Sequence, residues 1–304
     1  MNSCYITVFT PTYNRAHTLN RVFDSLKQQY FNDFEWLIVD DGSIDNTKDL
    51  VDTFIQSADF PIRYYYKENG GRHTAINLSY RYAKGKYIIN IDSDDALVAD
   101  ALKNIYDIWE GIPANDYDRY WCISGRCIDS KTHKMIGKPY CSNINHLSEK
   151  KKKKAMFKAG GEKSCCRKTE IIKQYPFPVF NDTKFVTENI VWERVNQRYD
   201  QYCVNDIFRI YYQNEPDSLV KGHVHIETKL NASYYAARFY INECTEQWYY
   251  NWLIVFEYVN ISRLALLTGR TFGCVMKELN SWYKRILVVL GYPISWIYIK
   301  IFDL

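Results

Sequence analysis

A short, mostly apolar segment of the chain ends abruptly in three carboxylates. Residues 87–91 are rich in β-branched and aromatic side chains, which is typical of a buried strand. Asp92, Asp94 and Asp95 follow directly, and charges at the end of a buried strand are costly unless other groups satisfy them. In an extended chain Asp92 and Asp94 point to the same face. This pair predicts a site for Mg²⁺ or Mn²⁺, and the alternative is that Ser93 or Asp94 caps the next helix.

Strand and helix patterns alternate through the first part of the chain. The expected strands are residues 5–10, 34–39, 62–66 and 87–91, and the expected helices are residues 17–30, 45–57, 74–83 and 98–109. Short connections and nearly continuous apolar strands predict a mostly parallel sheet with helices on both faces. The fold class is therefore α/β.

Each of these four strands is expected to end in polar residues. The four polar segments are Pro11–Asn14, Asp40–Ser43, Glu68–Arg72 and Asp92–Asp95. Ligands of open parallel sheets bind at the carboxyl ends of the strands, so we expect the four segments to converge on one site. The chain contains neither the G-x-G-x-x-G nor the G-x-x-x-x-G-K-[ST] pattern, which disfavours a dinucleotide dehydrogenase and a P-loop enzyme.

The composition of the chain further narrows the classes of protein to which it can belong. A net charge of +4 does not by itself indicate nucleic-acid binding, and we expect no such partner. The nine cysteines are odd in number and lack metal-ligand spacing, which favours reduced thiols in a cytosolic protein. The first residues show no basic region or cleavage site, so a secretory signal is not expected.

Five segments together resemble the family 2 glycosyltransferases. They are Thr10–Asn14 (Thr-Pro-Thr-Tyr-Asn), Trp36–Ser43 (Trp-Leu-Ile-Val-Asp-Asp-Gly-Ser), Asn69–Gly71, Ala83–Ile88 and Asp92–Asp95. The resemblance implies a GT-A fold, which is a Rossmann-like, mostly parallel sheet flanked by helices. It also implies an inverting transfer of sugar from a nucleotide-diphosphate donor, with UDP preferred, assisted by Mn²⁺ or Mg²⁺.

The resemblance also assigns roles to residues at the strand ends. Asp41 would accept a ring N–H of the nucleotide base. Asp92 would bind the ribose or belong to the shell of the metal, and Asp94 would bind the metal itself. The expected nucleotide-sugar site comprises Pro11, Tyr13, Asp41, Arg72 and Asp92, with Arg72 near the diphosphate.

Residues 184–194 resemble the segment that carries the catalytic base in this family. Asn189 stands where the usual basic carboxylate would be, and an amide cannot accept a proton at neutral pH. Glu188 is therefore the predicted base, with Thr187 as the N-cap of the helix. The alternative is that Glu188 is only a first-turn residue favoured by the helix dipole.

Two other classes of protein remain open. A non-catalytic sugar-nucleotide-binding protein is compatible with Asn189. A nucleotidyltransferase would also use acidic strand ends and a metal, although it would normally show a glycine-rich, basic loop after the first strand. Here that loop is Pro11–Arg15.

The second half of the chain gives weaker signals. We expect a strand at residues 121–128 and a turn at residues 134–137 leading into another strand. The five lysines 150–154 predict a solvated helix face, and the alternative is a contact with the acceptor or a membrane surface. Lys221, His223 and His225 lie in a loop that could close over a diphosphate or add a metal ligand, and the alternative is that they are ordinary surface residues. The expected domains are a GT-A domain at 1–225, with a nucleotide-binding half at 1–112 and an acceptor-binding half at 113–225, and a helical extension at 226–304.

The helical extension has an apolar, aromatic and basic composition. Residues 248–267 and 286–302 are apolar, but neither is a clean membrane span. From residue 263 onward the chain contains six Lys or Arg residues and only two acidic residues. This excess of positive charge suits peripheral attachment to an anionic inner leaflet. The alternative is a helical cap that packs on the sheet. We therefore expect a cytoplasmic protein at the inner face of the membrane, with a glycan or lipid-linked acceptor and a role in cell-surface polysaccharide or glycoconjugate synthesis.

Overall fold

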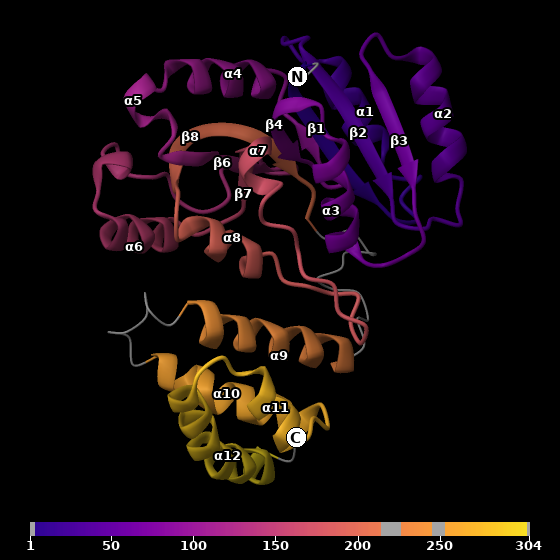
Figure 1. Ribbon diagram of the computed structural model, residues 1–304. Coiled ribbons are helices and arrows are strands. Elements are labelled where there is room, and N and C mark those ends of the chain that lie inside the picture. Colours follow the sequence, from indigo (N-terminus) through magenta and orange to yellow (C-terminus); the bar gives the residue numbers. More distant parts are fainter. Residues whose placement is uncertain (1–3, 214–225, 245–252, 303–304) are drawn as a thin grey trace. The chain divides into compact units, whose positions relative to one another are not determined.

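The computed structural model describes residues 4–213, 226–244 and 253–302 (Figure 1). The described residues form two compact units. The first contains residues 4–176 and 198–213, and the second contains residues 177–197, 226–244 and 253–302. The loop predicted to carry Lys221, His223 and His225 lies outside the described residues.

The first unit is built on one eight-stranded sheet with the order β3-β2-β1-β4-β7-β6-β8-β5. The strands are β1 (Cys4–Thr12), β2 (Phe34–Asp40), β3 (Ile62–Tyr66), β4 (Gly85–Asn90), β5 (Ala96–Leu97), β6 (Tyr120–Asp129), β7 (Lys163–Lys168) and β8 (Asp200–Tyr211). β3, β2, β1 and β4 are parallel neighbours (Figure 1). β7 runs antiparallel to β4 and β6, while β6 and β8 are parallel. The predicted mostly parallel α/β sheet is confirmed.

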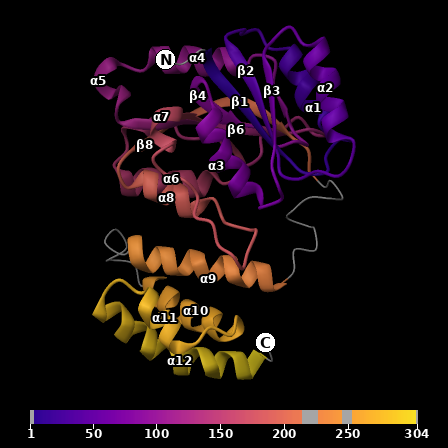
Figure 2. The same ribbon diagram turned by 45° about the vertical axis from the view of Figure 1, so that its right-hand side comes forward.

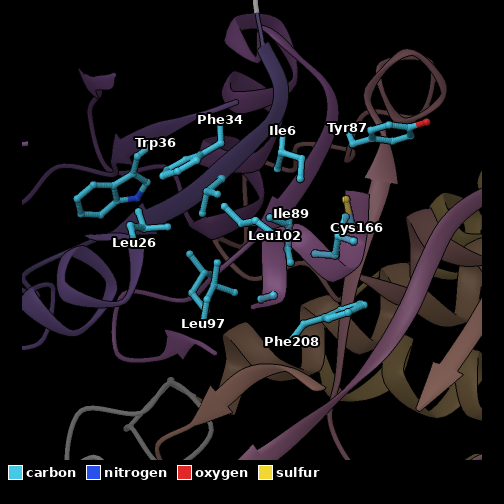
Figure 3. Packing of buried hydrophobic residues seen from close by; sticks show 14 of the residues in the cluster. Ile6, Leu26, Phe34, Trp36, Tyr87, Ile89, Leu97, Leu102, Cys166 and Phe208 are labelled. Atoms are coloured by element: carbon cyan, nitrogen blue, oxygen red, sulfur yellow. The ribbon is translucent and has the colours of Figure 1, made fainter. Parts of the chain in front are cut away.

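The helices of the first unit connect the strands over both faces of the sheet. They are α1 (Asn20–Lys27), α2 (Thr47–Ser57), α3 (Arg72–Tyr82), α4 (Ala101–Gly111), α5 (Ala114–Tyr117), the 3-10 helix η1 (Ile144–His146), α6 (Glu149–Ala159) and α7 (Thr169–Ile172). The apolar residues of α1, α2 and α4 join alternate residues of β1, β2 and β4 in one core. Figure 3 shows part of this core, including Leu26 of α1 and Leu102 of α4. α3 packs on β1 and β2, and its buried side chains are not members of that core.

Aromatic side chains dominate the core between the sheet and α1 and α2. The rings of Phe23 and Phe54 stack with their centroids 4.2 Å apart, and Trp36 is fully buried beside them. The indole N–H of Trp36 donates a hydrogen bond to the Thr10 hydroxyl over 3.0 Å. The polar end of this side chain is therefore satisfied, and its burial is a net gain of about 2 kcal/mol or more.

β1 continues two residues beyond the predicted strand and includes Pro11. β4 pairs with β1 only as far as Phe9, whereas β2 pairs with it through Thr12. Pro11 thus lies where β1 has a neighbour on one side only. The missing N–H of a proline is tolerated at such a position.

The prediction of a strand directly after the turn at residues 134–137 is wrong. Only an isolated bridge forms there, between Ile128 and Met135. The antiparallel partner of β6 is instead β7, at residues 163–168. β7 reads Lys-Ser-Cys-Cys-Arg-Lys, which has no apolar alternation and so gives no strand signal.

The five lysines 150–154 do lie on a helix, α6, but one of them is buried. The Lys152 ammonium group pairs with Asp200 over 3.0 Å and also donates to the Gln201 carbonyl. Its side chain is 2% exposed, whereas Lys151 is exposed. The prediction of a solvated face therefore fails at Lys152, which fixes α6 to the start of β8.

The second unit is helical, as predicted for the C-terminal region. Its helices are α8 (Asn189–Asn196), α9 (Ile226–Glu243), α10 (Leu253–Leu267), α11 (Phe272–Glu278) and α12 (Trp282–Phe302). The predicted N-cap is wrong: Glu188 occupies the cap position of α8 without a side-chain cap, and the buried Thr187 hydroxyl has no hydrogen-bond partner. No helix among the described residues combines the length and the apolar character needed to cross a membrane.

Candidate active site

The polar ends of β1 and β2 are joined by hydrogen bonds. Asn14 has a left-handed backbone (φ 52°), which asparagine tolerates better than most residues. Its N–H donates to the Ser43 hydroxyl and its side-chain oxygen accepts from the Ile44 N–H, both over 2.8 Å. The Asp41 N–H donates to the Thr12 carbonyl over 2.8 Å. The first two polar segments therefore form one rigid edge.

Asp41 organises the loop that follows β3. Its buried carboxylate accepts hydrogen bonds from the backbone N–H groups of Gly70 and Gly71, over 3.0 and 2.8 Å. The Asn69 amide donates to it over 3.3 Å, and the Lys67 ammonium group pairs with it as well. Four donors thus surround the carboxylate that the sequence assigns to the nucleotide base.

Gly42 is required by the geometry of this same loop. Its φ is 92°, and a Cβ at this position would lie 2.8 Å from the backbone nitrogen of Asn69. The preceding Asp40 is buried and accepts from the Ser43 N–H and the Tyr64 hydroxyl, both over 2.7 Å. The Asp-Asp-Gly-Ser sequence therefore forms a compact turn, and the structure explains why each of the four residues is present.

Asp92 lies between two arginines. Arg72, at the start of α3, donates to one carboxylate oxygen over 2.6 Å, and Arg209 of β8 donates to the other over 3.2 Å. Burial by itself would raise the pKa of Asp92, but the two guanidinium groups outweigh burial and hold the pKa below its usual value. Asp92 is therefore ionised at neutral pH, and it positions two cations at the end of β4.

The expected same-face arrangement of Asp92 and Asp94 in an extended chain does not occur. β4 ends at Asn90, and the Asp95 N–H donates to the Asp92 carbonyl over 3.1 Å. That bond closes a four-residue turn, so the alternation of a strand does not apply to the pair. The Asp94 side chain is half-buried, and its backbone carbonyl accepts from Arg21 over 3.0 Å.

Sequence reasoning missed the partnership of Arg209 with Asp95. The Asp95 side chain is completely buried 3.4 Å from the Arg209 guanidinium group, and its other oxygen accepts from the Tyr212 N–H over 3.0 Å. Burial raises the pKa of Asp95 to about 8, although Arg209 acts in the opposite direction. Arg209 also lies 3.4 Å from Glu162. An arginine inside a mostly apolar strand was the only sequence signal for this cluster.

Pro11 and Tyr13, the other residues expected at the nucleotide, differ in exposure. Pro11 is buried within β1, opposite Val39 of β2. The Tyr13 ring is 46% exposed at the end of the same strand. An exposed ring there offers a face on which a planar base can stack.

The described residues include no group of three or more His, Cys, Asp or Glu side chains arranged to hold a metal ion. Mg²⁺ and similar cations are commonly held by one or two carboxylates, with phosphate oxygens and water completing the shell. The half-buried Asp94 carboxylate fits that arrangement. Both oxygens of Asp92 already accept hydrogen bonds from arginines. Asp92 is therefore better suited to supporting the metal site than to binding the metal ion directly.

The predicted base, Glu188, belongs to the helical unit. One of its carboxylate oxygens accepts a hydrogen bond from the indole N–H of Trp192, one turn along α8, over 3.0 Å. The Trp192 ring in turn packs edge-on against Phe177. The carboxylate is therefore held in a defined direction, and its role as base stays a prediction.

The sheet is mostly parallel, and acidic and basic loops lie at the carboxyl ends of its strands. This is the architecture of nucleotide-binding α/β enzymes. The particular family follows from comparison with known proteins. The family model for glycosyl transferase family 2 matches residues 7–170, more than half of the chain. The chain therefore belongs to glycosyl transferase family 2.

Curated relatives carry glycosyltransferase names. An uncharacterized glycosyltransferase of Rickettsia felis is 40% identical over 98 residues, which are 32% of this chain and 16% of that protein. The GalNAc(5)-diNAcBac-PP-undecaprenol beta-1,3-glucosyltransferase of Campylobacter jejuni is 27% identical over 224 residues, covering 71% of this chain and 67% of that one. The chain thus spans only a minor part of the length of the Rickettsia relative.

Two solved structures share the fold. TarS 1–349 of S. aureus, crystallised with UDP-GlcNAc, covers 96% of this chain and 90% of its own with a TM-score of 0.57 and 15% identity. The mannosyltransferase PcManGT of Pyrobaculum calidifontis, in complex with GDP-Man and Mn²⁺, covers 96% and 80% with a TM-score of 0.50 and 16% identity. At such identities the likeness concerns the fold, and it confirms the GT-A expectation.

Proposed function

We propose that this chain transfers a sugar from a UDP-sugar to an acceptor hydroxyl, with inversion at the anomeric carbon. The observation that carries the proposal is the continuous series of hydrogen bonds along the carboxyl edge of the sheet. It runs from Asn14 to Ser43, from Asp41 to Gly71 and from Arg72 to Asp92. These contacts join all four polar strand ends, which supports a single nucleotide-binding site at this edge.

In the proposed donor half of the site, different residues contact different parts of the nucleotide sugar. Arg72 supplies a cation beside the expected diphosphate, and Asp92 orients it from the end of β4. Tyr13 supplies a face for the base, with Pro11 behind it in β1. Asp41 reads the base directly or through the Gly70–Gly71 backbone that it holds in place. Binding by several preformed groups favours a defined donor geometry.

Asp94 is the residue that would hold Mn²⁺ or Mg²⁺, together with the donor's phosphate oxygens. When bound, such a cation stabilises negative charge on the departing diphosphate. A GT-A neighbour that contains Mn²⁺ with its nucleotide sugar supports divalent metal use. Arg72 adds a permanent positive charge in the same region.

Glu188 would accept the proton of the acceptor hydroxyl as that oxygen attacks the anomeric carbon. The Trp192 indole donates to one oxygen of the carboxylate, which gives the proposed base a defined orientation. A single displacement inverts the configuration and forms no covalent sugar–enzyme intermediate. Positioned general bases contribute about 10²- to 10⁴-fold to such reactions.

The acceptor is proposed to be a glycan or a lipid-linked glycan. The Campylobacter jejuni relative carries a name that describes an undecaprenol-linked acceptor, which supports this class. We propose accordingly that the enzyme acts in the cytoplasm, at the inner face of the membrane, in cell-surface polysaccharide or glycoconjugate assembly. The proposed organisation has a nucleotide-binding half at residues 1–112, an acceptor-binding half at residues 113–225 and the helical extension beyond.

A second candidate is a sugar-nucleotide-binding protein without catalysis. Asn189 favours it, because the carboxylate usual at that position is replaced by an amide. A nucleotidyltransferase is less well supported, since the segment Pro11–Arg15, at the end of β1 and just beyond it, contains no glycine.

One experiment separates these functions. The purified chain is titrated calorimetrically with a panel of UDP-, GDP- and dTDP-sugars in the presence of Mn²⁺, and nucleotide release is then measured with and without acceptor glycans. We expect tight binding of one UDP-sugar and UDP release that an acceptor accelerates. Binding without release indicates the non-catalytic protein, and absence of binding to every donor overturns the proposal.

A further inference from the structure

α12 presents a broad apolar surface to its surroundings. The most exposed large apolar side chains on this helix are Trp282, Leu290, Ile294, Trp296, Ile297 and Ile301, each more than half exposed. At about 100° per residue they occupy nearly half of the helix circumference. Monomeric soluble proteins rarely expose a contiguous apolar surface of this kind, and one that persists marks an interaction site. We call these six side chains the α12 face.

The opposite side of α12 packs on α10 through small residues. A Cβ on Gly291 would lie 2.8 Å from the Tyr258 carbonyl oxygen, so the two helix backbones approach closely. The Ser295 hydroxyl donates to the Val259 carbonyl over 2.8 Å, and the Ser262 hydroxyl donates to a carbonyl of α12 over 2.9 Å. Figure 2 shows the two helices side by side.

This arrangement is the reverse of the usual distribution of large and small side chains on a helix in water. Helices of soluble proteins bury their large apolar side chains and expose small and polar ones. α12 buries Gly291 and Ser295 beside a single larger apolar side chain, Val288, and exposes Leu290 and Ile294. Close packing through small residues and serine hydroxyls is typical of helices whose outer surfaces face lipid.

The charges of α12 indicate which partner covers the α12 face. The helix carries Lys284, Arg285 and Lys300 and no acidic residue. Arg285 and Lys300 are exposed near its two ends, and the exposed Trp282 and Trp296 are of the type enriched at the membrane–water interface. Two antiparallel copies of this helix would bring Arg285 of one near Lys300 of the other without an acid to pair them. An anionic lipid surface complements these charges.

We propose that the α12 face binds the surface of an anionic lipid bilayer, with α12 lying in the plane of the interface. The apolar side chains enter the boundary between head groups and acyl chains, while the side packed on α10 stays away from the lipid. This inference goes beyond the transfer reaction, because it requires neither the donor site nor Glu188. It would bring the enzyme to the surface where a lipid-linked acceptor is presented.

The test uses the full chain and sedimentation with vesicles. The probes are phosphatidylcholine vesicles with and without phosphatidylglycerol. We expect binding to the anionic vesicles that weakens at high salt, and loss of at least about tenfold in affinity for the double variant Leu290→Glu/Ile294→Glu. The matched control is Phe157→Glu on α6, where Phe157 is 88% exposed; it should bind like the parent.

The outcomes are distinguishable from failure of the proposed function. Both altered side chains are exposed, so circular dichroism and the melting temperature should match those of the parent, and so should donor affinity. A parent chain that does not bind anionic vesicles overturns the inference, as does a double variant that binds equally well. A parent that is a dimer in ultracentrifugation, becomes a monomer in the double variant and binds no vesicles assigns the α12 face to a second copy instead.

Discussion

Arg209 donates a hydrogen bond to Asp92 over 3.2 Å, although 117 residues separate the two in the chain. Arg209 lies on β8 and Asp92 lies just after β4, so the contact joins the late, mixed part of the sheet to the edge that we propose as the donor site. The same guanidinium group lies 3.4 Å from the buried Asp95. One arginine therefore fixes both ends of the turn that also contains Asp94.

The first prediction concerns the pH dependence of stability. Burial raises the pKa of Asp95 to about 8, above the value of about 3.9 expected in the unfolded chain. The folded state then holds a proton that the unfolded state releases, so this contribution is complete below pH 4 and is lost as the pH rises to 8. Calorimetric melting temperatures from pH 4.5 to 8.5 should show this decline in the parent.

Asp95→Asn isolates the contribution, because the amide is neutral at every pH. The melting temperature of the variant should fall less than that of the parent as the pH rises. At pH 8.5 the stability of the variant should approach or exceed that of the parent. Groups remote from Asp95 titrate equally in both proteins, so the difference between the two profiles reports on Asp95 and its immediate neighbours. Parallel profiles over this range would show that Asp95 is ionised in the folded state.

The second prediction concerns Lys152. Lys152→Met keeps much of the side-chain volume but removes the ammonium group that pairs with Asp200 and the Gln201 carbonyl. Asp200 retains Arg119 at 3.0 Å, so we expect a loss of about 1–3 kcal/mol in the free energy of unfolding rather than the larger cost of an orphaned charge. Urea unfolding measures the loss. Lys151→Met, at an exposed position, should change stability by less than about 0.5 kcal/mol.

The first four strands could be predicted from the sequence because their signals are local. Each is a short apolar run followed by polar residues, and the polar segments converge as expected once the strands are parallel. β3 was predicted with its observed bounds, Ile62–Tyr66. The family resemblance rests on the same local segments, and the match to residues 7–170 confirms it.

The missed features depend on contacts between distant residues. Nothing in the run of five lysines distinguishes Lys152 from Lys151, because the burial of Lys152 is created by β8. Arg209 reaches Asp92 and Asp95 only after the sheet forms. The turn from Asp92 to Asp95 was taken for an extended chain, since strand alternation was carried past the residue where β4 stops. Helical pairing of α10 with α12 likewise determines which apolar residues of α12 remain exposed.

The third prediction tests the metal. Asp94→Asn keeps the size of the side chain and removes the charge that would attract a divalent cation. Donor affinity measured by calorimetry with Mn²⁺ should fall by about tenfold or more, whereas affinity measured in EDTA should hardly change. The matched control is Asp107→Asn, an exposed position on α4. An unchanged response to Mn²⁺ in Asp94→Asn would remove Asp94 from the metal site.

The fourth prediction decides whether the chain is an active transferase with an altered base. Glu188→Gln preserves the hydrogen bond from Trp192, because the amide oxygen still accepts, but it removes basicity. Donor affinity should hardly change, and kcat with a competent acceptor should fall by about 10²- to 10⁴-fold. The fall should be confined to kcat, since the substitution leaves the donor site intact.

Asn189→Asp is the companion variant, since it restores the carboxylate usual at this position in the family. If Glu188 is the base, the parent turns over without that carboxylate, and Asn189→Asp is not required for activity. A Glu188→Gln variant with parental kcat would exclude Glu188 as the base. A parent that binds the donor and never turns over, combined with an active Asn189→Asp variant, would identify the chain as a sugar-nucleotide-binding protein whose chemistry was lost at residue 189.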